Sequence, residues 1–193
     1  VIFTSDNGAA VGSSKPLRAK KFSVYDGGIR EPTLMRWPGR IPAGVVTDEI
    51  IATYDWYPTL AKLVGEGDRI PSDRPFDGLD MSRFLLGQAD ISGRDYFVYL
   101  GTDGEVISIK WKTMKVHFRY TESTSWIAPY IKPQIPMVCD LISDPHETID
   151  LMQSDLTYGW VIGAAMRPLI ALNQSAQQFR HVQVGEEGFS GYE

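Results

Sequence analysis

Cysteine, histidine and long runs of one charge or of apolar residues are all scarce in this sequence. Its 193 residues include a single cysteine, Cys139, which excludes an internal disulfide framework. The 24 acidic and 19 basic residues give a net charge of −5, which argues against nucleic-acid binding through bulk electrostatics. The longest apolar stretch, Trp160 to Leu172, is interrupted by Arg167 and Pro168 and is too short to cross a bilayer. We therefore expect no nucleic-acid partner and no transmembrane segment.

The apolar content, in contrast, is sufficient for a folded core. Hydrophobic residues make up 43% of the chain, enough for one large domain or two small ones. Between Gly87 and Arg94 the pattern changes from loops and short helices to alternating strands. We predict two parts, residues 1–90 and 91–193, and we expect Cys139 to be a small buried hydrophobic residue.

The first eight residues are the most informative stretch of the first part. The run Val1-Ile2-Phe3 is apolar and partly β-branched, which predicts a buried parallel strand. Asp6 and Asn7 follow at its carboxyl end, where open α/β sheets place their ligands, and Gly8 lets the chain turn. A carboxylate and an amide oxygen suit calcium or magnesium, although calcium needs about six to eight oxygen ligands. From these residues alone, a metal site and a simple tight turn both stay open.

The remaining elements follow from turn signals and apolar periodicity. In the first part we predict a polar loop over residues 9–21, a turn at 26–28 and a strand at 33–37 beside the opening strand. A helix with Pro58 in its first turn and Gly65 at its end follows, and then a short helix capped by Asp80. In the second part we predict strands at 96–100, 106–111, 114–120 and 137–142, then a helix from about residue 157 to 179 that Pro168 kinks.

Taken in order, several motifs resemble the carboxyl-terminal part of a type I sulfatase, the arylsulfatase-like branch of the alkaline phosphatase superfamily. The matching stretches are Phe3-Thr4-Ser5-Asp6-Asn7-Gly8, Pro16-Leu17-Arg18 through Lys21, Tyr25 through Pro32, Trp37-Pro38-Gly39, Asp55 with Pro58-Thr59, Asp77-Gly78-Leu79-Asp80, Lys110-Trp111-Lys112, and Asp144-Pro145-His146-Glu147 with Asp150-Leu151. The resemblance implies an α/β fold: the C-terminal part of a parallel or mixed sheet, followed by a small α+β subdomain with an antiparallel sheet and a long C-terminal helix.

The resemblance also implies a site. In such enzymes the aspartate and asparagine at the end of this strand complete a calcium site, so Asp6 and Asn7 are the expected metal ligands, with magnesium a less favoured cation. The lysine ahead of the Tyr-acid-Gly-Gly turn contacts the sulfate group, and the register places it at Lys21, with Lys20 as the second choice. The nucleophile of the family is a formylglycine made within a Cys-x-Pro-x-Arg or Ser-x-Pro-x-Arg motif. Cys139 is followed by Asp140-Leu141 and does not begin one; we expect the nucleophile, with the other calcium ligands, in an N-terminal portion upstream of the opening strand.

Other polar residues are expected to have structural or surface roles. We interpret Arg30 and Glu31 as a pair that braces the turn, and the Asp-Pro-His-Glu turn containing His146 as a connection from sheet to helix. His117 and His181 are expected to be ordinary surface histidines. Trp126, Tyr130 and the proline-rich segment 123–136 either line a substrate entrance or pack beneath a loop, and the sequence leaves both open.

The expected function is therefore that of a calcium-dependent sulfatase acting on aryl or carbohydrate sulfate monoesters. Residues 1–193 alone are expected to be inactive. A phosphatase or phosphonate hydrolase of the same superfamily and a non-catalytic, sulfatase-derived binding module are the alternatives. Tight calcium binding by the isolated chain would indicate a complete metal site, whereas millimolar or weaker binding would fit half of one. The compartment is unknown, and the resemblance implies a periplasmic, secreted or lysosomal protein.

Overall fold

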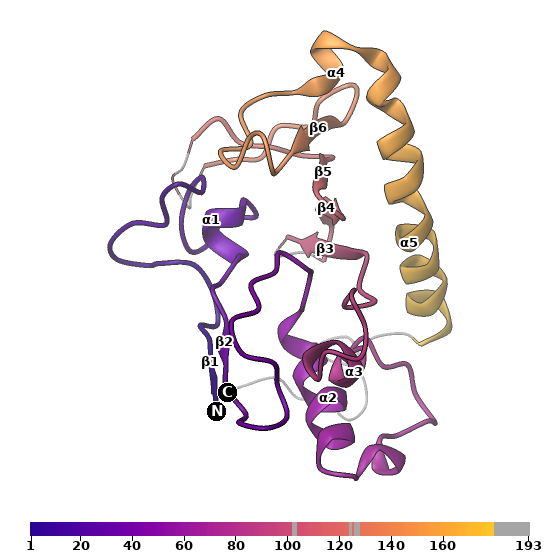
Figure 1. Cartoon of the computed structure of the whole chain (residues 1–193). Coiled ribbons are helices and arrows are strands. Elements are labelled where there is room, and N and C mark those ends of the chain that lie inside the picture. The colour runs from indigo at the N-terminus through magenta and orange to yellow at the C-terminus, as the bar shows by residue number, and fades with distance from the viewer. Residues whose placement is uncertain (102–103, 124, 126–127, 180–193) are drawn as a thin grey trace, which may run out of the picture.

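A four-stranded antiparallel sheet lies at the centre of the computed structural model, which describes residues 1–101, 104–123, 125 and 128–179 (Figure 1). The strands are β3 (Tyr96–Leu100), β4 (Val106–Trp111), β5 (Met114–His117) and β6 (Met137–Asp140), in the order β3-β4-β5-β6. The bounds of β3 and β4 agree with the predicted strands, and β5 is shorter than its alternating pattern suggested. Each strand pairs with its neighbour in sequence; a short turn joins β4 to β5, whereas the long segment 118–136 joins β5 to β6.

One face of this sheet is covered by the long C-terminal helix. Helix α5 (Gly159–Gln178) contains Pro168, and α4 (Leu151–Ser154) and a 3-10 turn (Leu156–Tyr158) lead into it. Its buried residues Val161 and Ala165 pack on Ile109, Val116 and Val138 of three successive strands. Ile109 lies opposite Val116 and Val116 lies opposite Val138 in the strand register, which is why the three side chains share a face. The predicted combination of an antiparallel sheet with a long packing helix is confirmed.

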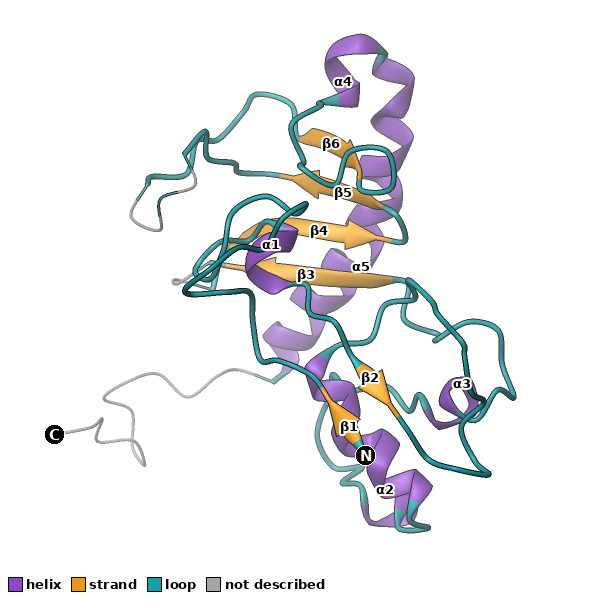
Figure 2. Ribbon diagram, turned by 60° about the vertical axis from the view of Figure 1, so that its left-hand side comes forward, coloured by secondary structure: helices purple, strands orange, loops and turns teal. Residues whose placement is uncertain are grey.

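The opposite face of the sheet is covered by the first part of the chain. Figure 2 shows the short helix α1 (Asp26–Ile29) in front of the sheet and α5 behind it. Val24 packs against Tyr99 and Ile107 on this side. The half-buried Tyr130 belongs to the same cluster and is therefore a packing residue. Trp126 lies outside the described residues. The sheet is thus covered on both faces. Alternating polar residues on its second face are therefore buried, contrary to the half-exposed pattern expected from the sequence.

The opening strand differs from its prediction. Strand β1 (Ile2–Phe3) pairs only with β2 (Leu34–Met35) in the part of the chain that the structure describes, and the pairing is antiparallel. Phe3 is 68% exposed, so the strand is neither parallel nor buried. The apolar composition predicted a strand covered on both faces, but composition cannot supply the neighbouring strands that cover it. The prediction that residues 33–37 contain a strand beside the opening one is confirmed.

Helix α2 (Trp56–Leu63) and helix α3 (Ser82–Leu85) follow, with 3-10 turns at Thr53–Asp55 and Gly67–Arg69. Pro58 lies in the first turn of α2, and Gly65 follows its end with φ +85°, as predicted. Asp80 accepts a hydrogen bond at 2.8 Å from the backbone N–H of Ser82, the first residue of α3, although the N-cap position itself is Met81. None of the helices in the described residues combines the length and hydropathy needed to span a membrane.

A buried ion pair crosses the predicted boundary near residue 90. The guanidinium of Arg94 donates to both carboxylate oxygens of Asp55, through Nε at 2.8 Å and an Nη at 2.5 Å. The same carboxylate accepts the backbone N–H groups of Ala52 and Leu79, both at 2.7 Å. This bidentate geometry ties α2 to the segment that enters the antiparallel sheet. The division into residues 1–90 and 91–193 stays a prediction.

Candidate functional site

The turn that carries Asp6 and Asn7 is locked against α1 by glycine contacts. Gly8 N donates to Gly28 O at 2.9 Å. A Cβ on Gly8 would lie 2.0 Å from Gly27 O, a distance that no side chain tolerates. Gly8 is therefore required because two backbones meet here, and not only because the chain turns.

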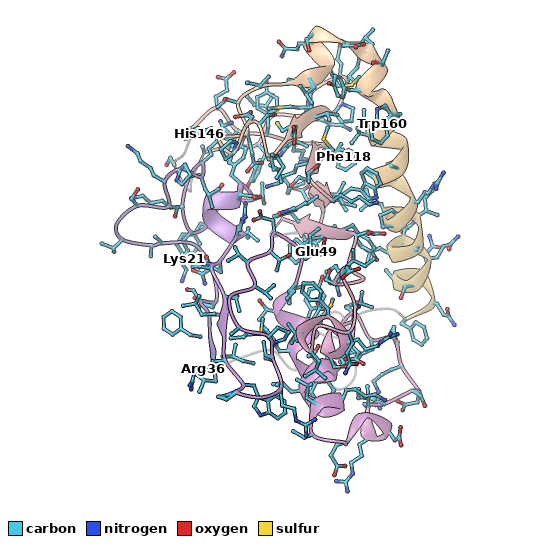
Figure 3. The ribbon with its side chains drawn as sticks, in the orientation of Figure 1. Lys21, Arg36, Glu49, Phe118, His146 and Trp160 are labelled. Carbon is cyan, nitrogen blue, oxygen red and sulfur yellow. The ribbon has the colours of Figure 1, made fainter. Side chains whose placement is uncertain are left out.

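The loop that carries Lys21 also packs closely against helix α1. A Cβ on Gly27 would lie 2.2 Å from Arg18 O, and a Cβ on Gly28 would lie 2.3 Å from Ser23 O, so the loop wraps closely around α1. Lys21 N also donates to Ala9 O at 3.3 Å. Because Ala9 comes two residues after Asn7, the fold brings the backbones of the three predicted site residues together. Figure 3 shows Lys21 beside α1, on the side of the sheet away from Trp160 and α5.

The side chains at this place are open to solvent on one side. Asp6 is exposed, and Asn7 and Lys21 are half-buried. Nearby, Glu31 has one carboxylate oxygen, Oε1, that is buried without a hydrogen-bond partner in the described structure. Burial raises the pKa of Glu31, and the negative charge of Asp6 adds to the increase. Two neighbouring carboxylates, one with an oxygen that lacks a partner, favour a cation between or beside them.

These donors fit part of a metal shell. Asp6 and Asn7 carry side-chain oxygen atoms of the type that calcium takes as ligands. Among the described residues, no group of three or more His, Cys, Asp or Glu side chains has an arrangement that could hold a metal ion. Calcium takes about six to eight oxygen ligands, so the half-site expected from the sequence stays a prediction.

The short helix α1 rests on a buried ionic cluster that sequence reasoning missed. Lys115 Nζ lies 3.0 Å from Asp26 Oδ1, 3.0 Å from Glu147 Oε2 and 2.8 Å from Val24 O, and its side chain is fully buried. Asp26 N donates to Glu147 Oε1 at 2.6 Å. The cluster therefore joins strand β5 and the Asp-Pro-His-Glu turn to the residues that hold the Lys21 loop.

His117 belongs to this cluster and is not a surface histidine. It is fully buried, and its Nε2 lies 2.8 Å from Glu147 Oε2, while its Nδ1 is buried without a partner in the described structure. Burial lowers the pKa of His117 against the opposing effect of Glu147. The expectation of a surface position was wrong because the polar face of β5 is covered by α1 and the turn before it. His181 lies outside the described residues.

The charges in the cluster set one another's protonation states. Burial alone would raise the pKa of Glu147, but the charge of Lys115 and the hydrogen bond from His117 outweigh burial and hold that pKa well below its ordinary value. Burial likewise opposes the charged form of Lys115, yet neighbouring Tyr99, Glu147 and Asp26 raise its pKa. Both groups are therefore ionised near neutral pH, and the cluster is a set of paired charges.

Arg18 completes the attachment of this loop to the sheet. Its guanidinium donates to Thr121 O at 2.7 Å and Glu147 O at 2.8 Å and lies 4.0 Å from the centroid of the Tyr25 ring. Tyr25 OH donates to the same Thr121 O at 2.7 Å. The predicted brace, Arg30 with Glu31, is not the one found: Arg30 pairs with Asp48 at 2.5 Å, and Arg18 holds the turn.

The letters Ser-x-Pro-x-Arg occur once in the sequence, at Ser14-Lys15-Pro16-Leu17-Arg18. Arg18 is engaged with two backbone carbonyls and an aromatic ring. Because this arginine holds the loop in place, the match of letters does not by itself assign a nucleophile to Ser14.

Cys139 is buried and has no catalytic environment. Burial raises the pKa of its thiol, which keeps it protonated and unreactive. The prediction of a small buried hydrophobic residue is confirmed. The Asp-Pro-His-Glu turn also has the predicted structural role, because Asp144 accepts the backbone N–H groups of Thr148 and Ile149 at 2.6 and 2.7 Å.

A signal for some of the missed residues was present in the sequence. Glu147 belongs to one of the motifs that carried the family resemblance, and its place in that motif is a signal of a role near the site. Lys115 lay on a strand face that was expected to be exposed, and Arg18 lay in a loop without periodicity. For these two, only contacts between distant segments identify the role.

Comparison with known proteins supports the resemblance. A family model described as Sulfatase matches residues 1–66. Arylsulfatase A of Homo sapiens is 34% identical over 193 aligned residues, covering 90% of this chain and 36% of that protein. N-acetylgalactosamine-6-sulfatase of Canis lupus familiaris is 38% identical over 133 residues, covering 65% of this chain and 24% of that protein. The crystal structure of PsFucS1 sulfatase from Pseudoalteromonas sp. aligns with a TM-score of 0.83 and 26% identity, covering 95% of this chain and 38% of that one.

The aligned shares of these three proteins lie between 24% and 38% of their lengths, so the chain spans only part of each relative. The family model, the relatives and the solved structure all carry the name sulfatase. The predicted α/β class, with an antiparallel sheet and a long C-terminal helix, is confirmed, and the PsFucS1 structure shares this fold. The resemblance predicted from the sequence is thus confirmed: the chain is related to the sulfatases and corresponds to a C-terminal portion of them.

Proposed function

We propose that the protein containing this chain is a calcium-dependent hydrolase of sulfate monoesters, with Asp6 and Asn7 as metal ligands and Lys21 as a sulfate contact. The observation that supports it is the fastening of the Asp6-Asn7-Gly8 turn and the Lys21 loop to the same glycines of α1, in a chain whose relatives are sulfatases. A phosphatase or a non-catalytic module is less favoured because the relatives described above carry sulfatase names.

The residue types suit the chemistry. A sulfate ester gathers negative charge on its oxygens while the S–O bond breaks, so positive charge placed there in advance lowers the barrier. Calcium would supply such charge and would orient the sulfate oxygens. Lys21 adds an ammonium group that binds one oxygen and holds the ester in place. The buried cluster of Lys115, Asp26 and Glu147 keeps the loop of Lys21 in position.

The nucleophile is proposed to be a formylglycine in an N-terminal portion of the protein. Residues 1–193 alone are then expected to bind calcium weakly and to show no turnover. The ester carries an aryl or carbohydrate group; the relatives' names include both an arylsulfatase and an amino-sugar sulfatase, so they do not narrow this further.

Turnover of 4-nitrophenyl sulfate tests the proposal. The natural protein should hydrolyse it, should lose activity when calcium is chelated and should regain it when calcium is restored. It should act poorly on 4-nitrophenyl phosphate. Lys21→Met should lower kcat by roughly 100- to 1,000-fold, the usual loss for one positioned donor to a developing charge.

Two matched variants make the lysine test specific. Lys15→Met changes an exposed lysine of the same loop and should leave kcat unchanged. Lys20→Met tests the second choice of register; a large loss there, with Lys21→Met near wild type, would transfer the role to Lys20. Calcium-independent turnover, or turnover by residues 1–193 alone, would contradict the proposed metal and nucleophile assignments.

A further inference from the structure

Lys110 is a half-buried lysine on β4 whose ammonium group lacks an acceptor among the described residues. In the sheet register it lies directly opposite Lys115, so both side chains project from the face that α1 covers. Lys115 contacts three oxygen atoms there, whereas the ammonium group of Lys110 forms no hydrogen bond or ion pair in the described part of the chain. Like charges directly across a strand pair are destabilising, and partial burial of an unpaired ammonium group costs further free energy.

Arg30 is a second cation with unused donors on the same side of the sheet. It directly follows α1, which lies in front of β3 and β4 (Figure 2). Its guanidinium donates to Asp48 through Nη2 alone, at 2.5 Å, and its remaining N–H groups form no hydrogen bond within the described residues. The side chains of this pair are 42% and 72% exposed. Such an exposed pair is weak, so a dissolved anion can compete with Asp48 for the guanidinium.

The acidic groups that act on Lys110 are already bound to other cations. Burial lowers the pKa of Lys110, and the positive charges of Arg30 and Lys115 lower it too. The carboxylates of Asp26 and Asp48 raise the same pKa, but they do not outweigh burial. Asp26 lies 3.0 Å from Lys115, and Asp48 is paired with Arg30. Lys110 and Arg30 therefore lie near enough to repel each other, and both have donors that no protein acceptor uses.

We propose that Lys110 and Arg30 form a binding site for a small tetrahedral oxyanion, either free sulfate or free phosphate, on the α1 side of the sheet. The anion accepts hydrogen bonds from the ammonium group of Lys110 and from the unused N–H groups of Arg30. A guanidinium fork can bind two oxygens of such an anion, and an ammonium group adds a point charge. Asp48 is the competing anion within the chain. This inference does not rest on the proposed calcium site or on the proposed role of Lys21.

Protection of Lys110 from acetylation tests the site in the natural protein. Acetic anhydride modifies accessible amines, and peptide masses report each lysine separately. Sodium sulfate should slow the acetylation of Lys110 by about threefold when roughly two thirds of the sites are occupied. It should leave the acetylation of Lys112, an exposed lysine on the adjacent turn, unchanged. Sodium chloride at equal ionic strength is the control for screening, and of sulfate and phosphate, the anion that protects at the lower concentration is assigned to the site.

Four variants locate the anion through the concentration that gives half-protection. Arg30→Met removes a charged hydrogen-bond donor and should raise that concentration about 10-fold or more. Asp48→Asn removes the competitor and should lower it about 1.5- to 5-fold, which corresponds to the strength of an exposed ion pair. Asp73→Asn removes the carboxylate of another exposed arginine pair and should leave it unchanged. Lys21→Met should also leave it unchanged.

A second measurement does not depend on the reactivity of Lys110. Equilibrium dialysis with radiolabelled sulfate, in a Lys21→Met background, counts the anion bound without the proposed sulfate contact. Adding Lys110→Met should abolish this binding, whereas adding Lys112→Met should preserve it. Equal binding by these two double variants would overturn the site even if Lys110 is too shielded to acetylate.

Two results of the acetylation experiment would also overturn the site. One is equal protection by chloride, which would reduce the effect to ionic screening. The other is protection that Lys21→Met abolishes and Arg30→Met leaves intact, which would place the anion elsewhere. Selective protection of Lys110 in a natural protein that hydrolyses no sulfate ester would support the site and contradict only the proposed hydrolase.

Discussion

Replacing Lys115 with methionine removes the ammonium group that lies 3.0 Å from both Asp26 and Glu147. Methionine has a similar length and no charge, so the change tests the electrostatic contribution with little change in volume. The two carboxylates would remain fully or almost fully buried, without the cation that faces them. They would repel each other and lose a charged hydrogen-bond donor.

The expected cost follows from these distances. At an effective dielectric constant of about 20, each contact of 3.0 Å between opposite charges is worth about 5 kcal/mol before desolvation. Desolvation of the lysine itself offsets several kcal/mol of this. Removing one partner of a buried pair typically costs about 3–5 kcal/mol, and we expect Lys115→Met to fall in that range. This is a large share of the roughly 5–15 kcal/mol that stabilises a typical domain.

Urea denaturation of the natural protein provides the measurement, with Lys112→Met as the matched control. Lys112 is an exposed lysine on the adjacent turn, and its replacement should change the free energy of unfolding by less than about 0.5 kcal/mol. Combining Lys115→Met with Glu147→Gln should cost less than the two single effects added together. If Lys115→Met yields no folded protein, Glu147→Gln alone offers a milder change in the same cluster. Equal stability of Lys115→Met and Lys112→Met would refute the reasoning.

Three further predictions concern pH, a glycine and the second buried pair. The folded state lowers the pKa of Glu147 and of His117, so it binds fewer protons than the unfolded chain at acidic pH. The free energy of unfolding should therefore fall as pH drops below about 6.5, because of His117, and again below about 4.5, because of Glu147. His117→Gln should flatten the first decrease. Gly8→Ala should disrupt the site and lower the thermal unfolding midpoint, because its Cβ would lie 2.0 Å from the carbonyl oxygen of Gly27. In Gly163→Ala, on helix α5, the new Cβ meets no neighbour, so this variant should stabilise the folded protein by up to about 1 kcal/mol. Arg94→Ala should cost about 3–5 kcal/mol in urea denaturation, and Arg94→Lys less, because lysine keeps the charge but loses the bidentate geometry.

Each of these predictions has a clear contrary result. Stability that rises on acidification from neutral pH would contradict the protonation states assigned to Glu147 and His117. A Gly8→Ala variant as stable and active as Gly163→Ala would mean that the approach to α1 is not required. Arg94→Lys as destabilised as Arg94→Ala would show that the charge contributes little at this position.

Much of the second part of the chain could be predicted from the sequence. Strands β3 and β4 have the predicted bounds, and α5 lies within two residues of its predicted ends, because their patterns are long and local. Proline, glycine and aspartate likewise marked the ends of α2 and α3 through their backbone preferences and hydrogen bonds. These signals act within a few residues and need no partner elsewhere.

The predictions that failed concerned what covers each element. The apolar residues of β1 predicted a buried parallel strand, yet Phe3 is exposed and the pairing with β2 is antiparallel. The polar residues Lys115 and His117 predicted an exposed face, yet both are fully buried. A strand pattern reports which side chains share a face, but not what lies against that face.

The sequence by itself determined the local elements, the family resemblance and the set of candidate residues Asp6, Asn7 and Lys21. Only the tertiary structure decided how they are held. The close approach of Gly8 to α1, the attachment of the turn by Arg18, and the pairing of Lys115 with Glu147 all join segments far apart in the chain. Such contacts depend on distance in space, and no periodicity along the sequence encodes it.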